Sequence, residues 1–431
     1  PRPSRLPLRI LQLGAIAVVL AVAMLHAFEL DRFFIPKELV LHLAAFLAGL
    51  FAFRPIVRAR LTRVDVLLAV YLLLSVVSAL FATNPWLAMR AVAISVSGIV
   101  IFWTARALRD AGLGNALLNG LAFAVVLAAI TCLLQTYGIE LAVFSENRAP
   151  GGTLGNRNFV AHIAAFGLPL VLLAALRAQR RRTFFVVSLG VMIVAAWLVL
   201  TRSRAAWLAF AAMLFVFLAA FVVSPAVRRD GRTWRRLTML VLLAACGVSA
   251  ALLIPNRLRW RSDNPYLETV KRVADYQGGS GRGRIVQYEQ SLLMGLRHPF
   301  LGVGPGNWSV EYPKSAVRDD PSMSDSEGGM TTNPWPSSDW MAILSERGIF
   351  AAALLALAFL GIFYKGMKQL KDAPDAETGL LAAALLGIVA GAMVTGLFDA
   401  VLLLAVPTFL VWAALGALFV PADGSNRGSL V

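Results

Sequence analysis

Long apolar runs alternate with short charged gaps along almost the whole chain. About twelve of these runs are long enough for an α-helix to cross a bilayer. Their approximate limits are 10–28, 39–53, 64–82, 87–107, 113–135, 159–175, 184–200, 205–223, 237–254, 340–364, 380–398 and 401–420. Backbone polar groups in lipid must be satisfied within their own segment, which a helix achieves. The pattern therefore predicts an all-α polytopic membrane protein with about 12 transmembrane helices.

One long polar stretch, 255–337, interrupts the apolar pattern. It is rich in Arg, Asp, Gly, Pro, Tyr and Trp, and a segment of such mixed charge cannot lie in hydrocarbon. We therefore predict three parts. Residues 1–254 carry helices one to nine, 255–337 form a large and partly helical extramembrane loop, and 338–431 carry helices ten to twelve with a polar cytoplasmic tail.

Composition supports the membrane assignment. Hydrophobic residues make up 58% of the 431 residues and charged residues only 15%, whereas a soluble domain is about half apolar and about a quarter charged. The net charge of +16 raises the possibility of a nucleic-acid partner. We reject that partner because the arginines cluster in short gaps between apolar runs, where positive charge orients a membrane protein.

The charged gaps also predict the topology. The gaps after runs two, six, eight and ten are basic, whereas the others are short or of mixed charge. Cytoplasmic loops carry the excess of Lys and Arg, so this alternation places both termini in the cytoplasm. The large loop, the turn 201–204 and the Gly/Asn-rich loop 137–158 then all lie on the external face.

Several arginines on that external face break the usual charge bias. These are Arg148, Arg157, Arg202, Arg204, Arg282 and Arg284. The planar fork of Arg pairs with two phosphate oxygens at once, so the natural partner at a bilayer surface is an anionic phosphate or diphosphate group. For Arg204 and Arg284 we favour a functional role. For the other four, snorkelling or ordinary salt bridging is the stronger interpretation.

Other chemical signals are weaker. Gly302–Trp308 lacks a βαβ context, so its glycines predict a tight turn with close backbone approach rather than a nucleotide site. His298 is more consistent with a loop residue, and His162, within an apolar run, with a packed one. For Arg90, near the start of run four, we favour snorkelling over a polar cavity. Residue spacing suggests no metal site, although Asp319 and Asp320 are weak candidates for a cation.

Four motifs carry a resemblance to a known family: TRSRAAW at 201–207, GRIVQY at 283–288, HPFLGVGPGNW at 298–308 and SSDWMAILSERG at 337–348. With the overall topology, they resemble the O-antigen ligase and O-antigen polymerase superfamily of membrane glycosyltransferases. The ligases transfer O-polysaccharide from undecaprenyl diphosphate to lipid A–core, at the periplasmic face of the bacterial inner membrane. The resemblance implies a GT-C-like, inverting reaction that uses no metal or other cofactor.

The family pattern also assigns residues. It implies an essential arginine at the turn, which is Arg204, and another at the start of the loop helix, which is Arg284. Arg202 and Arg282 are further candidates for holding the diphosphate. Guanidinium groups can neutralise a leaving diphosphate as a metal ion does elsewhere. We expect a lateral cavity lined by Arg204 and Arg284 and roofed by the large loop.

The chain departs from the family at one position. Where the family has a histidine proposed as general base, this chain has Ser337, and a serine hydroxyl cannot act as a base unaided. One interpretation is an inactive variant, which we favour because the surrounding residues keep the pattern. A second is that Asp339 or Glu346 serves as the base. A third is that the histidine position is shifted in register.

Other functions stay open at this point. Within the superfamily, an O-antigen polymerase would use a second lipid-linked glycan as acceptor, and a protein O-oligosaccharyltransferase would use a protein. A secondary transporter is the alternative from a different class. It predicts inverted repeats, broken helices and charges near the membrane midplane, and few charges lie deep in the apolar runs.

Overall fold

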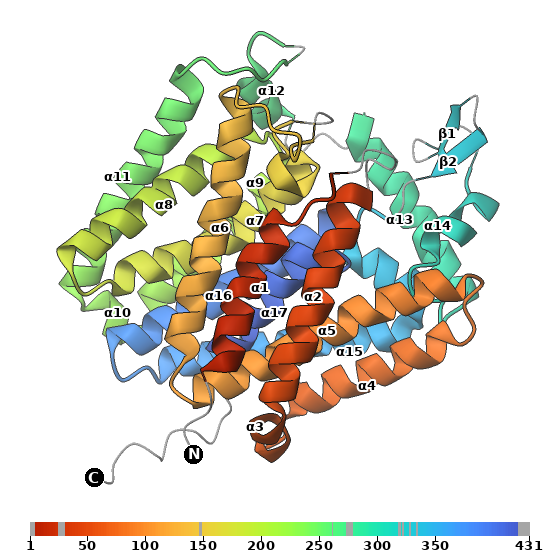
Figure 1. The fold of residues 1–431 in the computed structure, drawn as a ribbon, viewed down its shortest axis with the longest axis horizontal. Helices are drawn as coiled ribbons and strands as arrows, with labels where there is room; N and C mark the ends of the chain where they lie inside the picture. The colour runs from red at the N-terminus through yellow and green to blue at the C-terminus, as the bar shows by residue number, and fades with distance from the viewer. Residues whose placement is uncertain are drawn as a thin grey trace.

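A computed structural model describes residues 5–24, 31–145, 149–260, 262–272, 279–317, 320, 323–326, 329–332 and 335–420. These residues form seventeen α-helices, two short 3-10 helices and one small β-hairpin. Figure 1 shows α3 and α10 toward one end of a helical bundle and α12 at the opposite end. The predicted all-α polytopic class is confirmed, with the hairpin as a small addition.

Twelve of the helices correspond to the twelve apolar runs. They are α1 (Leu6–Leu20), α2 (Asp31–Phe51), α4 (Arg63–Ala79), α5 (Pro85–Asp110), α6 (Gly114–Thr136), α7 (Arg157–Arg177), α8 (Arg181–Leu200), α9 (Arg204–Val223), α11 (Gly231–Leu253), α15 (Asp339–Lys371), α16 (Ala376–Phe398) and α17 (Ala405–Leu418). In the described part of the chain, nine of them are long and apolar enough to cross a membrane. The other three, α1, α4 and α17, are shorter, with 15, 17 and 14 residues.

The remaining elements are short or belong to the polar stretch. They are α3 (Phe53–Arg58), α10 (Pro225–Arg228), α12 (Pro265–Lys271), α13 (Gly279–Arg297), α14 (Trp308–Glu311), the 3-10 helices Gly152–Leu154 and Tyr312–Lys314, β1 (Met323–Ser326) and β2 (Gly329–Thr332). The two strands are antiparallel, with Met323 opposite Thr332. Figure 1 places α13, α14 and this hairpin together along one edge of the molecule.

Polar residues in the gaps fix where several helices begin. Asn84 accepts hydrogen bonds from the first backbone N–H groups of α5, and Asp230 and Asp375 do the same for α11 and α16. Thr62 and Asp65 form a reciprocal capping box at the start of α4. Each cap satisfies N–H groups that have no partner within the helix. The gaps between apolar runs therefore define helix starts as well as turns.

Basic residues gather at one end of the bundle, which we call the basic end. Arg236 donates from Nη1 to the Leu176 carbonyl at 2.7 Å, and Arg177 Nε bonds to Glu377 Oε1 at 3.0 Å. These contacts join the end of α7 to the starts of α11 and α16. The last turns of α15 carry Lys368 and Lys371 and lead directly into α16. Three of the four predicted basic gaps, those after runs six, eight and ten, thus lie together, as the positive-inside rule requires of one membrane face.

Glycine contacts show which helix ends lie opposite. Gly391 of α16 packs against Phe166 of α7 and Met213 of α9, and Gly387 against Pro169 and Phe217. Residue numbers fall along α16 as they rise along α7 and α9, so these helices run antiparallel to α16. The starts of α7 and α9 therefore lie level with the end of α16, at what we call the site end.

Helix α15 bends where it meets the polar loop. Gly348 interrupts the helix with φ 82° and ψ 173°, and the Ile349 N–H donates to the Pro299 carbonyl at 2.9 Å. Gly302, Gly304 and Gly306 all have positive φ. A Cβ at Gly302 would lie 2.2 Å from the Glu346 carbonyl carbon. The predicted tight turn with close backbone approach is confirmed, and the backbone it approaches is the bend of α15.

Substitution of Gly302 tests this packing. We expect Gly302→Ala to lower the thermal midpoint in detergent well beyond the effect of Gly112→Ala, a matched control. Both glycines have positive φ, but a Cβ at Gly112 meets nothing within 4 Å. The control variant loses only about 1–2 kcal/mol of stability, the cost of an alanine in a left-handed backbone conformation. Gly302→Ala adds an overpacking cost of about 1–3 kcal/mol. Equal shifts in the two variants would contradict the close approach.

Candidate functional site

Helix α13 lies across the end of α16 at the site end. Arg284 donates from Nε to the carbonyl of Phe398, the last residue of α16, at 2.9 Å. One turn further on, the Tyr288 hydroxyl donates to the Leu397 carbonyl. The last carbonyls of a helix have no partner within it, so they are available to these side chains. Arg284 and Tyr288 thus bind α13 to the end of α16.

Ser337 lies beside this junction. Its backbone N–H donates to Gln287 Oε1 at 2.9 Å, and its carbonyl accepts from the Tyr288 hydroxyl at 3.4 Å. The next residue, Ser338, caps α15 and donates from Oγ to the Gly396 carbonyl at 2.9 Å. The structure therefore brings Ser337 and Arg284 into one cluster, built from α13, α16 and the start of α15.

Arg202 and Arg204 occupy the turn between α8 and α9. Arg202 has φ 52°, and its guanidinium lies 4.5 Å from the centre of the Trp260 ring. It also donates from Nε to Thr269 Oγ1 at 2.9 Å. Arg204 donates from Nη1 to the Arg272 carbonyl at 2.7 Å. The segment that follows α11 therefore covers this turn and holds both arginines.

Arg204 and Arg284 lie at the same end of the bundle. Arg204 begins α9, which starts level with the end of α16, and Arg284 is bonded to that end. Arg282 is exposed, and residues two apart on a helix do not share a face. Arg157 lies 5.0 Å from the same Trp260 ring as Arg202. Arg148 and Asp319 fall outside the described residues, and Asp320 accepts a hydrogen bond from the Tyr312 hydroxyl.

Two further residues lie in the Arg284 cluster, and neither of them was assigned a functional role from the sequence. Asp399 follows α16, and its Oδ2 lies 3.7 Å from His162 Nε2 of α7. His162 is packed, as predicted, with 1% of its surface exposed. The sequence does distinguish Asp399, because it is a carboxylate between two closely spaced apolar runs. A charged side chain placed so near lipid is costly and is therefore often functional. For His162 the sequence offers no such signal.

Tyr288 supplies a hydroxyl that stays protonated. Burial is the main reason that its pKa rises from 10 to about 12, and the Arg284 charge opposes the rise. The phenol therefore remains a neutral donor to the carbonyls at the end of α16 throughout the neutral range. Its role is to position α13, since it contacts the backbone on both sides of the junction.

The two carboxylates considered as alternative bases are both engaged with backbone. Asp339 accepts from the Val401 and Leu402 N–H groups at 2.9–3.1 Å. Glu346 accepts from Gly306 N at 2.8 Å and Trp308 N at 3.2 Å. Both side chains are nearly fully buried. These contacts make Asp339 and Glu346 structural residues and argue against either one as the base.

A cavity of about 170 Å³ lies beneath the loop. Its wall includes Glu38 and Arg90, whose side chains form a two-bond ion pair at 2.6 and 2.8 Å. Arg90 therefore lines this cavity in an ion pair with Glu38, and the preference for snorkelling stays a prediction. The Trp335 ring also lines the cavity and packs against Phe34 at 5.2 Å. The expected cavity lined by Arg204 and Arg284 is a different one and stays a prediction.

Similarity to a known protein family falls in this same region of the chain. Residues 189–356 match the family model described as O-antigen ligase. This match supports membership of the chain in the O-antigen ligase/polymerase superfamily. The match runs from α8 through the polar loop into α15, so it includes Arg204, Arg284 and Ser337. No curated protein matches the chain.

The match to the O-antigen ligase family indicates the general class of chemistry. The chain has the apolar helices of a multi-pass membrane protein, and the family that it matches consists of membrane glycosyltransferase-like enzymes, which implies lipid-linked glycans as substrates. In the described part of the chain, no three His, Cys, Asp or Glu side chains come together as a metal site. Where the donor and the acceptor bind is proposed below from the residues of the site.

The raised pKa of Tyr288 gives a pH prediction. Tyr288→Phe removes a hydrogen bond and lowers stability by about 1 kcal/mol at neutral pH. The hydroxyl's contribution is present below pH 10 and is lost as pH rises toward about 12, because ionisation costs more in the folded state. Thermal midpoints should therefore differ at pH 8, and the difference should shrink above pH 10.

Tyr364→Phe is the control for this measurement, since that side chain is 68% exposed on α15. We expect it to leave the midpoint unchanged at both pH values. A Tyr288→Phe effect that stays constant up to pH 12 would contradict the assignment of the buried hydroxyl.

Proposed function

We propose that this protein is an O-antigen ligase. It would transfer O-polysaccharide from undecaprenyl diphosphate to lipid A–core in lipopolysaccharide biosynthesis. The observation that carries the proposal is the shared location of Arg204 and Arg284 at the site end, with Ser337 beside Arg284. Two arginines near the bilayer surface suit a lipid diphosphate, because each guanidinium can pair with two phosphate oxygens.

The proposed reaction inverts the donor sugar. The acceptor hydroxyl attacks the anomeric carbon, the bond from that carbon to the diphosphate oxygen breaks, and undecaprenyl diphosphate leaves with the electron pair. Arg204 and Arg284 stabilise the charge that develops on the leaving diphosphate. The hydroxyl proton passes to a general base. We propose that no metal ion is required, because fixed positive charge supplies the stabilisation.

Ser337 leaves the base position without a suitable group. Its backbone is held by Gln287 and Tyr288, so a side chain at 337 starts from a fixed position beside Arg284. A serine hydroxyl near neutral pH cannot take the acceptor proton without a base of its own. We therefore expect this chain, with serine at position 337, to transfer glycan weakly or not at all.

The proposed setting is the bacterial inner membrane, with both termini cytoplasmic and the site on the periplasmic face. The clustering of Arg and Lys at the basic end supports this orientation, since cytoplasmic loops carry the excess of positive charge. The site end, with Arg204 and Arg284, is the opposite one.

A transfer assay with Ser337→His tests the function. Purified protein in liposomes receives undecaprenyl-diphosphate glycan and rough lipopolysaccharide, with a chelator present. We expect Ser337→His to transfer glycan at least about 10²-fold faster than this chain, the usual contribution of a general base. Extension of one lipid-linked glycan by another would instead identify a polymerase. No turnover by either form of the protein would contradict both the ligase and the polymerase function.

Arginine variants in the Ser337→His background test the diphosphate site. Arg204→Lys and Arg284→Lys keep the charge but lose the two-oxygen geometry, so kcat should fall by about 10²-fold or more. Arg257→Gln is the control, because the Arg257 side chain forms an exposed pair with Glu140 at 3.2 Å, away from Arg204 and Arg284. Unchanged kcat in both lysine variants, with normal melting, would remove Arg204 and Arg284 from the reaction.

A further inference from the structure

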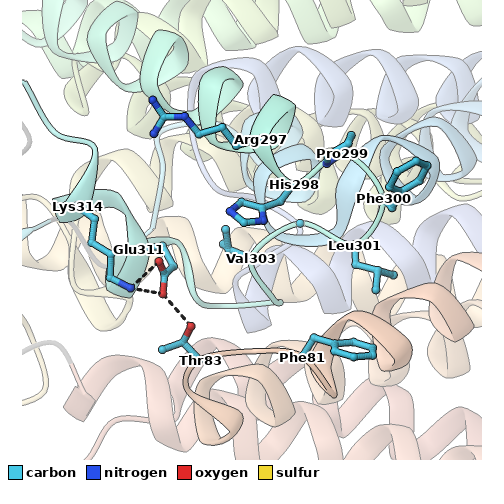
Figure 2. Close-up of a pocket in the computed structure, with 11 residues that line it drawn as sticks. Phe81, Thr83, Arg297, His298, Pro299, Phe300, Leu301, Val303, Glu311 and Lys314 are labelled. Atoms are coloured by element: carbon cyan, nitrogen blue, oxygen red, sulfur yellow. Dashed lines mark hydrogen bonds and ion pairs between the residues drawn. The ribbon is translucent and has the colours of Figure 1, made fainter.

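A second, larger cavity lies at the far end of α13. It measures about 550 Å³ and lies between the end of α13, the loop that follows it and the turn from α4 to α5 (Figure 2). Arg297 lines it, thirteen residues after Arg284 on the same helix. At 1.5 Å per residue this separation is about 20 Å. The cavity is therefore distinct from the Arg204–Arg284 region.

Its polar wall carries an excess of positive charge. Lys314 donates from Nζ to both oxygens of Glu311 at 2.8 and 2.7 Å, and Thr83 Oγ1 donates to Glu311 Oε1 at 2.8 Å. Glu311 is therefore already neutralised. Within the described ranges, the Arg297 guanidinium has no ion-pair partner, so one positive charge remains in excess. His298 adds a ring nitrogen, and Figure 2 shows it directed toward the side on which Glu311 lies.

The cavity has an apolar rim of exposed aromatic rings. Phe81 and Phe300 line it and are 72% and 67% exposed. The Phe350 ring, 54% exposed, stacks on Phe300 with centroids 6.0 Å apart. Phe81 follows the end of α4, and Phe350 begins the part of α15 beyond its bend, so both lie at the ends of apolar helical segments. Exposed apolar rings that gather in this way mark a surface suited to contact with lipid.

We propose that this cavity binds the phosphate headgroup of an anionic membrane phospholipid. Arg297 and Lys314 contact the phosphate, and the acyl chains run along Phe300 and Phe350. A free phosphate would leave these rings without a role, which is why we commit to a lipid. A zwitterionic headgroup would bring its own cation against Arg297 and Lys314, so the excess charge selects an anionic one. This site does not depend on the proposed transfer reaction.

Lipid binding to the purified full chain tests the proposal without any transfer assay. Native mass spectrometry compares phosphatidylglycerol with phosphatidylcholine on delipidated protein. We expect phosphatidylglycerol to bind about tenfold more tightly or better, and Arg297→Gln with Lys314→Gln to abolish that preference. Both side chains are exposed, so folding should be unaffected. Equal binding of the two lipids would overturn the proposal.

Three controls sharpen the result. Arg257→Gln with Arg259→Gln removes two exposed charges elsewhere on the polar stretch and should leave the preference intact; an equal loss there would mean unspecific surface charge. Glu311→Gln removes a carboxylate from the wall and should tighten phosphatidylglycerol binding severalfold. Glycerol 1-phosphate should compete weakly, and displacement of the lipid at matched concentration would indicate a free-phosphate site instead.

Discussion

The bend of α15 joins the polar loop to the membrane helices. From its outer side, Glu346 accepts the Gly306 and Trp308 N–H groups, and its carbonyl accepts Gly304 N at 2.9 Å. From its inner side, Arg347 bonds to Ser95 Oγ at 2.9 Å and to Tyr71. A buried carboxylate and a buried guanidinium are costly without partners, so these contacts hold the bend in place. The position of α13 over the end of α16 depends on it.

Much of the fold could be predicted from the lengths of apolar runs, because hydrocarbon thickness sets the length of a crossing helix. The ends of the helices were harder to predict where the change from apolar to polar residues does not coincide with the end of the helix. Run ten was expected to end near Tyr364, yet α15 continues to Lys371. Lysines mark where a helix leaves the lipid, whereas the helix itself continues until backbone hydrogen bonding stops. The bend at Gly348 was likewise invisible, since it arises from contact with Pro299 and Phe300.

The candidate site was predictable only where a residue broke a local rule. Arg204 and Arg284 stood out because external arginines oppose the charge bias. Tyr288 did not, because its partner Leu397 lies 109 residues away and only tertiary packing brings them together. Asp339 and Glu346 were credible bases in the sequence because a carboxylate's backbone partners are unknown until the turns of 304–308 and 399–404 are placed.

Arg347 has a consequence for how the chain is assembled. It is fully buried, and in the described part of the chain its partners are hydroxyl and carbonyl groups of α4 and α5 rather than a carboxylate. An arginine entering lipid before those partners would be strongly disfavoured. Ser95 precedes it by 252 residues, so translation delivers α4 and α5 to the membrane first. The order of synthesis thus places the hydrogen-bonding partners of Arg347 on α4 and α5 in the membrane before the first half of α15 is inserted.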